Sequence, residues 1–500
     1  MVKLTPYLTK SKYVAGLQCS LRLWKQVYAP LPYREPVRGS PEYEGTQIGK
    51  LARNCFPNGV LVDNEVYDHC GAIERTKSLL AEGCPAIFEG TFEFDNRRIR
   101  VDILKNLGEG RWALYEVKSS TSIHPEHRQD AAFQADVLRQ CGIKLDSVSI
   151  CHVDNDYRLG VNGLDITKFF RFVDITQDLH AQCEELVSDL EIMAATLGAA
   201  ESPKVSPGLH CWKPYACEFL DQCAASLPKD WIGNLPRINQ AQIDEMSALG
   251  VSSMAEIPDT LKLRGVQETV RAAHGAGVPF ISSELQYLLR PLAPPAFYLD
   301  FESLMPGIPL YAETETAPYQ HIPFLFSLHR TEDEALHHSD YIAPPGDDPR
   351  RAFAVELIRQ TSLGEGAIIV YSAYEKRIIN ELARALPDLA VDLKKIIDRL
   401  QDLLAIVRKA VYLPAFNGSF SIKDVGPALA ADVSYADLDI KNGSTAAAVY
   451  QQLVEEGSKT NEVLRSLSSL RAYCKRDTLA MVRVHQALTA FANSNREAGN

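Results

Sequence analysis

Apolar and polar residues alternate along two neighbouring stretches in the first half of the chain. These stretches are FEGTFEFDNRRIRVDILK, residues 88–105, and RWALYEVKSS, residues 111–120. A period of two predicts half-buried strands. The segment NLGEG between them supplies turn residues, so we predict a β-hairpin or meander. Residues 130–142, DAAFQADVLRQCG, then show apolar residues at helical spacing, and Gly142 marks the end of a predicted helix.

The rest of the chain divides at segments rich in proline. SPKVSPGLH, residues 202–210, predicts a loop, and residues 228–290 predict short helices with a tight turn at Gly250. LLRPLAPPAF, residues 288–297, contains three prolines and predicts a linker. A new alternation of strand and helix patterns begins at FYLDFESL and continues to the end. We therefore predict a mixed α/β protein with three domains, at residues 1–227, 228–290 and 291–500.

Composition narrows the class of protein. A chain of 500 residues is too long for one core, and its 46% hydrophobic and 23% charged residues are typical of globular proteins. No apolar run approaches about 18 residues, and the N-terminal stretch lacks the apolar region of a signal peptide. We expect a cytoplasmic protein without a membrane partner.

Charge is unevenly distributed along the chain. The net charge of −12 argues against a nonspecific coat protein for nucleic acid. Residues 1–53 nevertheless carry nine basic residues against the three acids Glu35, Glu42 and Glu44. The basic residues are Lys3, Lys10, Lys12, Arg22, Lys25, Arg34, Arg38, Lys50 and Arg53. This basic arm predicts either a surface that contacts phosphate groups or an ordinary solvated face.

A first group of candidate catalytic residues lies on the predicted meander. Asp102 ends the run RIRVD, and Glu116 and Lys118 share one face of the next strand because side chains alternate. Two carboxylates can hold Mg²⁺ or Mn²⁺, and a lysine can stabilise charge on a phosphodiester. By themselves, a glutamate and a lysine on one strand face are more often a surface ion pair. Gln134 and Asp130 on the following helix are further polar candidates.

A second group consists of cysteines. The chain has eleven, and HCWKPYACEFLDQC places three of them at six-residue steps: Cys211, Cys217 and Cys223. Three thiolates need a fourth ligand for tetrahedral zinc or for a [4Fe–4S] cluster. His210 is the local candidate for that ligand, and Cys19 in GLQCSLRLW is the remote one. The alternative is three buried free cysteines.

The opening YLTKSKYVAGLQCSLRLW, residues 7–24, resembles that of RecB-like PD-(D/E)xK nucleases with an iron–sulfur cluster, the CRISPR-adaptation and AddB types. The order of the cysteines and of the Asp…Glu-x-Lys motif matches these proteins over about residues 8–225. The resemblance implies a restriction-endonuclease-like fold, a [4Fe–4S] cluster (or zinc) on Cys19, Cys211, Cys217 and Cys223, and catalytic roles for Asp102, Glu116, Lys118 and Gln134. Leu138 stands where the family has Tyr, and Gly49 lies near the position of the family's metal-binding His.

A third group occupies the last 200 residues. Asp300 and Glu302 in AFYLDFESL share a strand face, and Tyr473 and Asp477 share a helix face. These pairs resemble the first and last motifs of DEDD exonucleases with the DnaQ-like, RNase H-type fold, over about residues 296–490.

The DEDD resemblance implies metal ions on Asp300, Glu302 and Asp477, with Tyr473 positioning the attacking water. Glu375 in YSAYE stands for the middle acid, where the family has Asp, and Ser372 replaces the usual Asn. Asp402 is a second candidate for that acid. The alternative is that Asp300 and Glu302 are surface acids.

Together these motifs predict a Mg²⁺- or Mn²⁺-dependent nuclease that hydrolyses DNA phosphodiester bonds, with a RecB-like centre and a second, 3′–5′ exonuclease-like centre. The alternative is a noncatalytic nucleic-acid-binding scaffold built on degenerate nuclease domains. In the middle region, ALGVSSMAEIP, residues 248–258, resembles helix-hairpin-helix modules, in which amides around a glycine turn hold a DNA phosphate. A plain helical linker is the alternative there.

Overall fold

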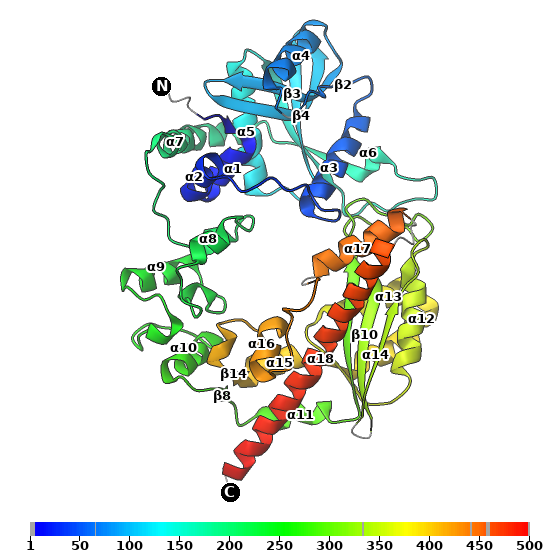
Figure 1. Ribbon diagram of the computed structural model, residues 1–500. Coiled ribbons are helices and arrows are strands. Elements are labelled where there is room, and N and C mark those ends of the chain that lie inside the picture. Colours follow the sequence, from blue (N-terminus) through cyan, green and yellow to red (C-terminus); the bar gives the residue numbers. More distant parts are fainter. Residues whose placement is uncertain (1–5, 66, 333–334, 441–442, 457–460, 499–500) are drawn as a thin grey trace. The chain divides into compact units, whose positions relative to one another are not determined.

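The computed structural model describes residues 6–65, 67–332, 335–440, 443–456 and 461–498. The chain forms two compact units: unit 1 comprises Met1–Ala225 and Pro306–Gln320, and unit 2 comprises Ser226–Met305 and His321–Asn500. Each unit combines helices with a mixed sheet (Figure 1), which confirms the prediction of a mixed α/β protein. No helix in these described ranges is long and apolar enough to cross a lipid bilayer.

The sheet of unit 1 has the order β2-β3-β4-β5-β6-β7, and β1 pairs with β4 in parallel. The predicted meander is present as β3, β4 and β5, which pair in antiparallel fashion. Asp95 and Asn96 adopt positive φ angles of 44° and 56° between β3 and β4, so the first predicted run is two strands. The strands are β1 (Leu8–Thr9), β2 (Val60–Leu61), β3 (Ala86–Phe94), β4 (Arg97–Gly108), β5 (Arg111–Lys118), β6 (Lys144–Val153) and β7 (Phe170–Asp174).

Helix α5 covers one face of this sheet, and its residues Phe133 and Val137 belong to the same hydrophobic core as Leu114 of β5. It begins at Pro125, five residues before the predicted start, because His124 caps it and Pro125 suits the first helical position. The helices of unit 1 are α1 (Lys10–Gln18), α2 (Ser20–Tyr28), α3 (Pro41–Ala52), α4 (His69–Ala81), α5 (Pro125–Gln140), α6 (Ile166–Phe169), α7 (Asp178–Gly198) and α8 (Leu220–Ala224), with short 3₁₀ turns η1 (Arg53–Cys55) and η2 (Leu209–Cys211).

A segment from far along the sequence, Pro306–Gln320, also belongs to unit 1. The amide of Gly307 donates to Glu44 of α3 at 3.1 Å. The hydroxyl of Tyr319 donates to the carbonyl of Ser119, which directly follows β5. The chain therefore passes from unit 2 into unit 1 at Pro306, contacts unit 1 beside the end of β5, and re-enters unit 2 after Gln320.

The sheet of unit 2 has the order β11-β10-β9-β12-β13. Its central strand β9 pairs antiparallel with β10 and parallel with β12. Phe297, Leu299 and Phe301 of β9 enter one core, whereas Tyr298 faces the opposite side and joins a second core. The strands are β9 (Ala296–Leu304), β10 (Ile322–Glu332), β11 (Ala335–Ile342), β12 (Ala367–Val370) and β13 (Leu400–Asp402), and a separate pair is formed by β8 (Phe280–Ile281) and β14 (Val411–Tyr412).

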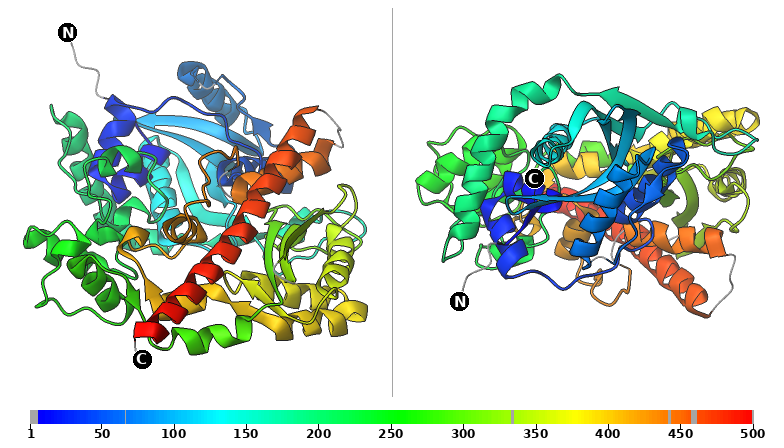
Figure 2. Two further views of the ribbon diagram at one scale, coloured as in Figure 1. Left: turned by 60° about the horizontal axis from the view of Figure 1, so that its bottom comes forward. Right: turned by 90° about the horizontal axis from the view of Figure 1, so that it is seen from above.

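The long helix α18 packs against β9 and β10, as Figure 1 and Figure 2 show in red. It lies on the Tyr298 face of the sheet, where the hydroxyl of Tyr298 meets His485 at 2.8 Å. The helices of unit 2 are α9 (Gln240–Ala248), α10 (Val266–Ala276), α11 (Leu285–Leu289), α12 (Pro349–Thr361), α13 (Tyr374–Ala385), α14 (Ala390–Arg399), α15 (Leu403–Ala410), α16 (Ile422–Leu429), α17 (Gly443–Glu456) and α18 (Asn461–Ala498), with 3₁₀ turns η3 (Ile232–Asn234), η4 (Met254–Glu256), η5 (Arg290–Leu292), η6 (Pro387–Leu389) and η7 (Pro414–Phe416).

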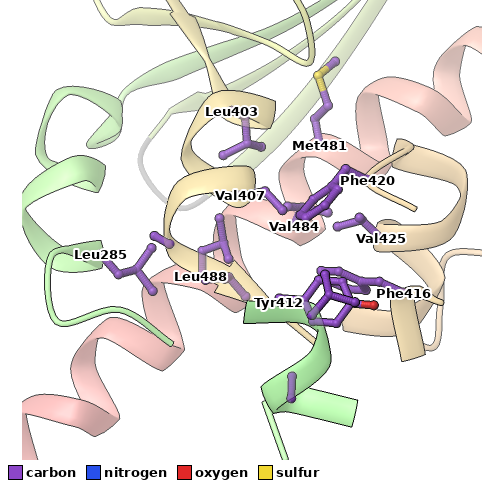
Figure 3. Close-up of a cluster of buried hydrophobic side chains, with 14 of the residues drawn as sticks. Leu285, Leu403, Val407, Tyr412, Phe416, Phe420, Val425, Met481, Val484 and Leu488 are labelled. Atoms are coloured by element: carbon purple, nitrogen blue, oxygen red, sulfur yellow. The ribbon is translucent and has the colours of Figure 1, made fainter. Parts of the chain in front are cut away.

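The helical middle of the chain shares a hydrophobic core with the C-terminal part (Figure 3). Leu285 of α11 contributes to the same core as Val407 of α15, Phe416 of η7 and Leu488 of α18. Leu292 is fully buried in this core, so the proline-rich segment predicted as a linker is packed rather than open. Burial of its apolar side chains stabilises the packed arrangement, although its prolines favour an extended chain.

Candidate active site

A buried polar cluster forms in unit 1 where β4 and β5 run side by side. Antiparallel pairing brings Asp102 beside Glu116. The amide of Val117 donates to Asp102 at 2.7 Å, and the ammonium of Lys118 donates to Glu116 at 2.8 Å. The structure thus brings together the three residues of the predicted Asp…Glu-x-Lys motif.

Helix α5 supplies two further members of this cluster. Lys118 also donates to Asp130, at 2.6 Å. The amide group of Gln134 donates to Glu116 at 2.8 Å and to Asp130 at 3.0 Å. Glu116 is 1% exposed and Gln134 is fully buried, so the surface ion pair considered as the alternative for Glu116 and Lys118 does not describe this site.

Lys10 is a member of the cluster that the sequence analysis did not single out. Its ammonium lies 3.3 Å from Asp102 and 3.0 and 3.3 Å from the two carboxylate oxygens of Glu116. Lys10 is the first residue of α1, which Thr9 caps, and β1 pairs with β4 immediately before it. In the sequence it was one of nine basic residues in the arm, and no spacing rule linked it to Asp102.

The charged groups of this cluster shift one another's pKa values. Burial and the neighbouring Glu116 raise the pKa of Asp102 to about 7, although Lys10 and Lys118 oppose this shift. Burial also disfavours ionised Glu116, but Lys10 and Lys118 hold its pKa below the ordinary value. Nearby carboxylates raise the pKa of Lys118 against the effect of burial. Burial lowers the pKa of Lys10, but Asp102 and Glu116 raise it further, so the cluster favours the charged forms of Glu116 and of both lysines.

The cluster opens into a cavity of about 600 Å³. Gly49 of α3 lies in its wall, near the position where the resemblance leads us to expect a histidine. A Cβ atom on Gly49 would meet no atom within 4 Å, so this part of the wall has open space. Other residues that line the cavity are Glu42, Arg53, Glu89, Arg100 and Ser119.

Four cysteines of unit 1 line one small pocket: Cys19, Cys211, Cys217 and Cys223. Cys19 lies between α1 and α2, and the other three come from the segment after α7. Gln18 ties the two parts together, because its side-chain amide donates to the carbonyls of His210 at 2.6 Å and Tyr215 at 2.8 Å. In the described ranges, no three of these sulfurs, with or without His210, lie within 4.8 Å of one another.

A second acidic cluster forms in unit 2. Asp300 and Glu302 lie on the face of β9 that α18 covers, because they alternate with the residues of the opposite core. Asp477 and Tyr473 of α18 reach the same place, and the hydroxyl of Tyr435 donates to Asp477 at 2.7 Å. Glu302 is buried and Asp300 is partly buried, so the alternative of two surface acids does not describe this pair.

Cys474 of α18 also belongs to this second cluster, although no sequence motif indicated it. Its sulfur lies 4.0 Å from Glu302. Ligand atoms of Asp300, Glu302 and Cys474 all lie within 4.8 Å of one another, so these residues form a group that could hold a metal ion. The signal available in the sequence was its place directly after Tyr473.

The two candidates for the middle acid differ in their surroundings. Glu375 is buried at the start of α13, receives a hydrogen bond from Ser372 at 3.4 Å, and raises the pKa of Asp300. Asp402 instead caps α15 by accepting from the amide of Ala405 at 3.2 Å. Glu375 is therefore the better placed of the two.

Like charges crowd the second cluster. Burial and Asp477 raise the pKa of Glu302 to about 8, and burial raises the pKa of Glu375 to about 7. Burial and the neighbouring acids Asp477, Glu375 and Glu302 also raise the pKa of Asp300. Lys423 of α16 acts in the opposite sense on Glu302. The cluster has more carboxylates than its surroundings neutralise, which is the condition that a bound cation relieves.

The turn after α9 differs from the predicted helix-hairpin-helix chemistry. The amide of Gly250 donates to Ser247, and that of Val251 to Met246. The amides of Ser252 and Ser253 both donate to Glu256, at 3.2 Å. These donors already have partners inside the protein, which favours the plain helical linker.

A family model described as Domain of unknown function (DUF2779) matches residues 297–421. The match covers 125 of the 500 residues and includes Asp300, Glu302 and Glu375 but not Asp477. No curated protein matches the chain.

Proposed function

We propose that this protein is a metal-dependent nuclease whose principal centre is the cluster of Asp102, Glu116, Lys118 and Gln134. The observation that carries the proposal is the convergence of these side chains within hydrogen-bonding distance at the wall of a cavity of about 600 Å³. The expected substrate is nucleic acid, DNA in the first place. A cavity lined by Arg53 and Arg100 as well as acids suits a phosphate backbone.

The donor set of this centre fits a hard divalent cation, Mg²⁺ or Mn²⁺. Asp102 and Glu116 offer carboxylate oxygens, and the ammonium of Lys10 already stands between them, so their geometry accepts a positive charge. A divalent ion held by the two carboxylates supplies Lewis-acid stabilisation of charge on the phosphate. Gln134 fixes the orientation of Glu116 through its hydrogen bond.

Lys118 supplies a positive charge from the protein that can stabilise the reacting phosphate. Glu116 and Asp130 hold its ammonium at 2.8 and 2.6 Å, so it enters the reaction already oriented. An oriented cation stabilises negative charge that develops on the phosphate, and it costs no reorganisation at that moment.

Four thiols that line one pocket are a donor set for a [4Fe–4S] cluster or for tetrahedral zinc. The order of the four cysteines around the Asp…Glu-x-Lys motif favours the [4Fe–4S] cluster. Such a cluster would join α1 and α2 to the segment after α7. Because Lys10 begins α1, the cluster would also hold the cavity wall in place.

Unit 2 supports a second, exonuclease-like centre. Asp300, Glu302 and Asp477 would hold metal ions, Glu375 would complete the acids, and Tyr473 would position the water that attacks the phosphodiester. The crowding of buried carboxylates described above supports this assignment.

Cleavage assays on the purified chain test the proposal. Single- and double-stranded DNA and RNA are incubated with Mg²⁺ or Mn²⁺ and with EDTA, for the wild type, Asp102→Asn, Asp300→Asn and the double variant. We expect metal-dependent cleavage that falls at least about 100-fold in Asp102→Asn. Cleavage that remains in Asp102→Asn and disappears in the double variant measures the activity of the second centre. Equal cleavage by wild type and double variant would refute both assignments.

A noncatalytic scaffold is the second candidate, and Gly49 favours it because it leaves the cavity without one protein ligand. A scaffold binds nucleic acid with an affinity that falls steeply with salt, yet it cleaves none with any metal. Binding and cleavage measured on the same oligonucleotides distinguish the two candidates.

A further inference from the structure

Lys10 occupies the place between the two carboxylates of the unit 1 centre. Its ammonium contacts both oxygens of Glu116 and one oxygen of Asp102, all within 3.3 Å. Lys118 approaches Glu116 as well, but its second partner is Asp130 on α5. The centre therefore has two lysines with different neighbours, and only one of them belongs to the Glu-x-Lys motif.

The two acids that Lys10 contacts differ in exposure. The side chains of Lys10 and Asp102 are 28% and 22% exposed, whereas that of Glu116 is 1% exposed. Lys10 also lines the cavity. Its ammonium thus lies between the buried Glu116 and the space where a substrate would enter.

Two arginines that line the cavity pair with an acid outside the centre. Arg53 lies 2.7 Å from Glu89, and Arg100 lies 3.1 Å from the same carboxylate. Lys10 instead shares its acids with the centre itself. Placing the ammonium of Lys10 beside these acids costs desolvation free energy, and an apolar side chain could pack there without that cost. A role in the reaction is therefore the simpler explanation for a lysine at this place.

We propose that Lys10 is a second catalytic lysine of this centre. Its ammonium bridges Asp102 and Glu116. With a divalent cation held by these carboxylates, the ammonium of Lys10 would contact a nonbridging oxygen of a phosphodiester bound in the cavity. Lys10 transfers no proton and forms no covalent bond; it contributes positive charge. This inference rests on the proposed nuclease function.

The test compares Lys10→Met and Lys10→Arg with Lys12→Met. Methionine keeps most of the length of the side chain without its charge. Lys12 lies on the same helix, and its ammonium donates to the carbonyl of Tyr7 at 3.2 Å. All proteins, including the reference, carry Asp300→Asn, so that Mn²⁺ binding measured by titration calorimetry reports on unit 1. Cleavage of a DNA oligonucleotide is measured at saturating Mn²⁺.

We expect Lys10→Met to move the two measurements in opposite directions. Mn²⁺ should bind at least about threefold more tightly, because no internal ammonium competes for the carboxylates. Cleavage should fall at least about 100-fold at saturating Mn²⁺, as when an oriented stabilising donor is removed. Lys10→Arg should keep more activity than Lys10→Met, and Lys12→Met should match the reference protein in both measurements.

Three results would overturn the inference. If Lys10→Met cleaves like the reference while the reference is active, the proposed function stands and the role of Lys10 fails. If Lys10→Met lowers Mn²⁺ affinity, cleavage and melting temperature together, Lys10 is a structural residue only. If the reference and Lys12→Met show no metal-dependent cleavage, and Asp102→Asn does not change the Mn²⁺ titration, both proposals fail.

Discussion

Replacing Glu302 with Gln should change how the stability of unit 2 depends on pH. Burial and Asp477 raise the pKa of Glu302 to about 8 in the folded protein, against an ordinary value of 4.5. Between these two values the folded state holds a proton that the unfolded state has lost. The free energy of unfolding of the metal-free protein therefore falls as pH rises from about 4.5 to about 8. Gln cannot ionise, so it removes this contribution.

The magnitude follows from the shift. A pH of 7 is about 2.5 units above the ordinary pKa of the carboxyl group in the unfolded chain. This difference corresponds to a loss on the order of 3 kcal/mol in the free energy of unfolding. For a domain of this size, that difference shifts the melting temperature by about 6–12 °C. Glu302→Gln should thus be more stable than the wild type at pH 8 in EDTA, and close to it at pH 5.

Calorimetric melts at pH 5 and pH 8, with EDTA or with Mn²⁺, measure both effects. Mn²⁺ should raise the melting temperature of the wild type at pH 8 more than that of Glu302→Gln, because the variant lacks one metal-binding carboxylate. Glu245→Gln, at an exposed position on α9, serves as the matched control and should follow the wild type. Parallel pH curves for the wild type and Glu302→Gln would refute the reasoning that buried like charges strain this cluster.

Three further substitutions test other parts of the structure. Cys19→Ser should abolish the broad absorbance near about 400 nm that a [4Fe–4S] cluster gives, and a colourless wild type with stoichiometric zinc would contradict the assignment. Gly49→His should tighten Mn²⁺ binding about tenfold, or about 1.4 kcal/mol, since the wall of the cavity has room for the new ligand; unchanged affinity in titration calorimetry would show that the ring does not reach the metal. Phe416→Ala should lower the free energy of unfolding of unit 2 by about 3–5 kcal/mol, because its ring is 1% exposed in the shared core; a loss below about 1 kcal/mol in denaturant titration would contradict that burial.

Local pattern was enough to predict several features of the two centres. Alternation along β5 predicted that Glu116 and Lys118 share a face, and the four-residue step on α18 predicted the same for Tyr473 and Asp477. These rules work because the period of a strand or helix is set by the backbone. Helix ends were less certain. The capping chemistry at His124 and Pro125 extended α5 beyond its apolar pattern.

Features that join distant parts of the chain could not be predicted in this way. Lys10 reaches Glu116 across 106 positions, and Cys474 reaches Glu302 across 172. Both meetings depend on strand pairing and helix packing, since β1 pairs with β4 and α18 packs on β9. A residue type at one position does not reveal which partner the fold will bring to it.

The sequence by itself determined which residues are candidates for chemistry: the acids, the motif lysine and the cysteines, whose order is the basis of the nuclease prediction. The tertiary structure decided which of them are buried together, that Lys10 stands between two carboxylates, and that Pro306–Gln320 belongs to unit 1. The physical reason is the range of the interactions. Backbone geometry and side-chain alternation act over a few residues, whereas burial and charge pairing depend on the whole fold.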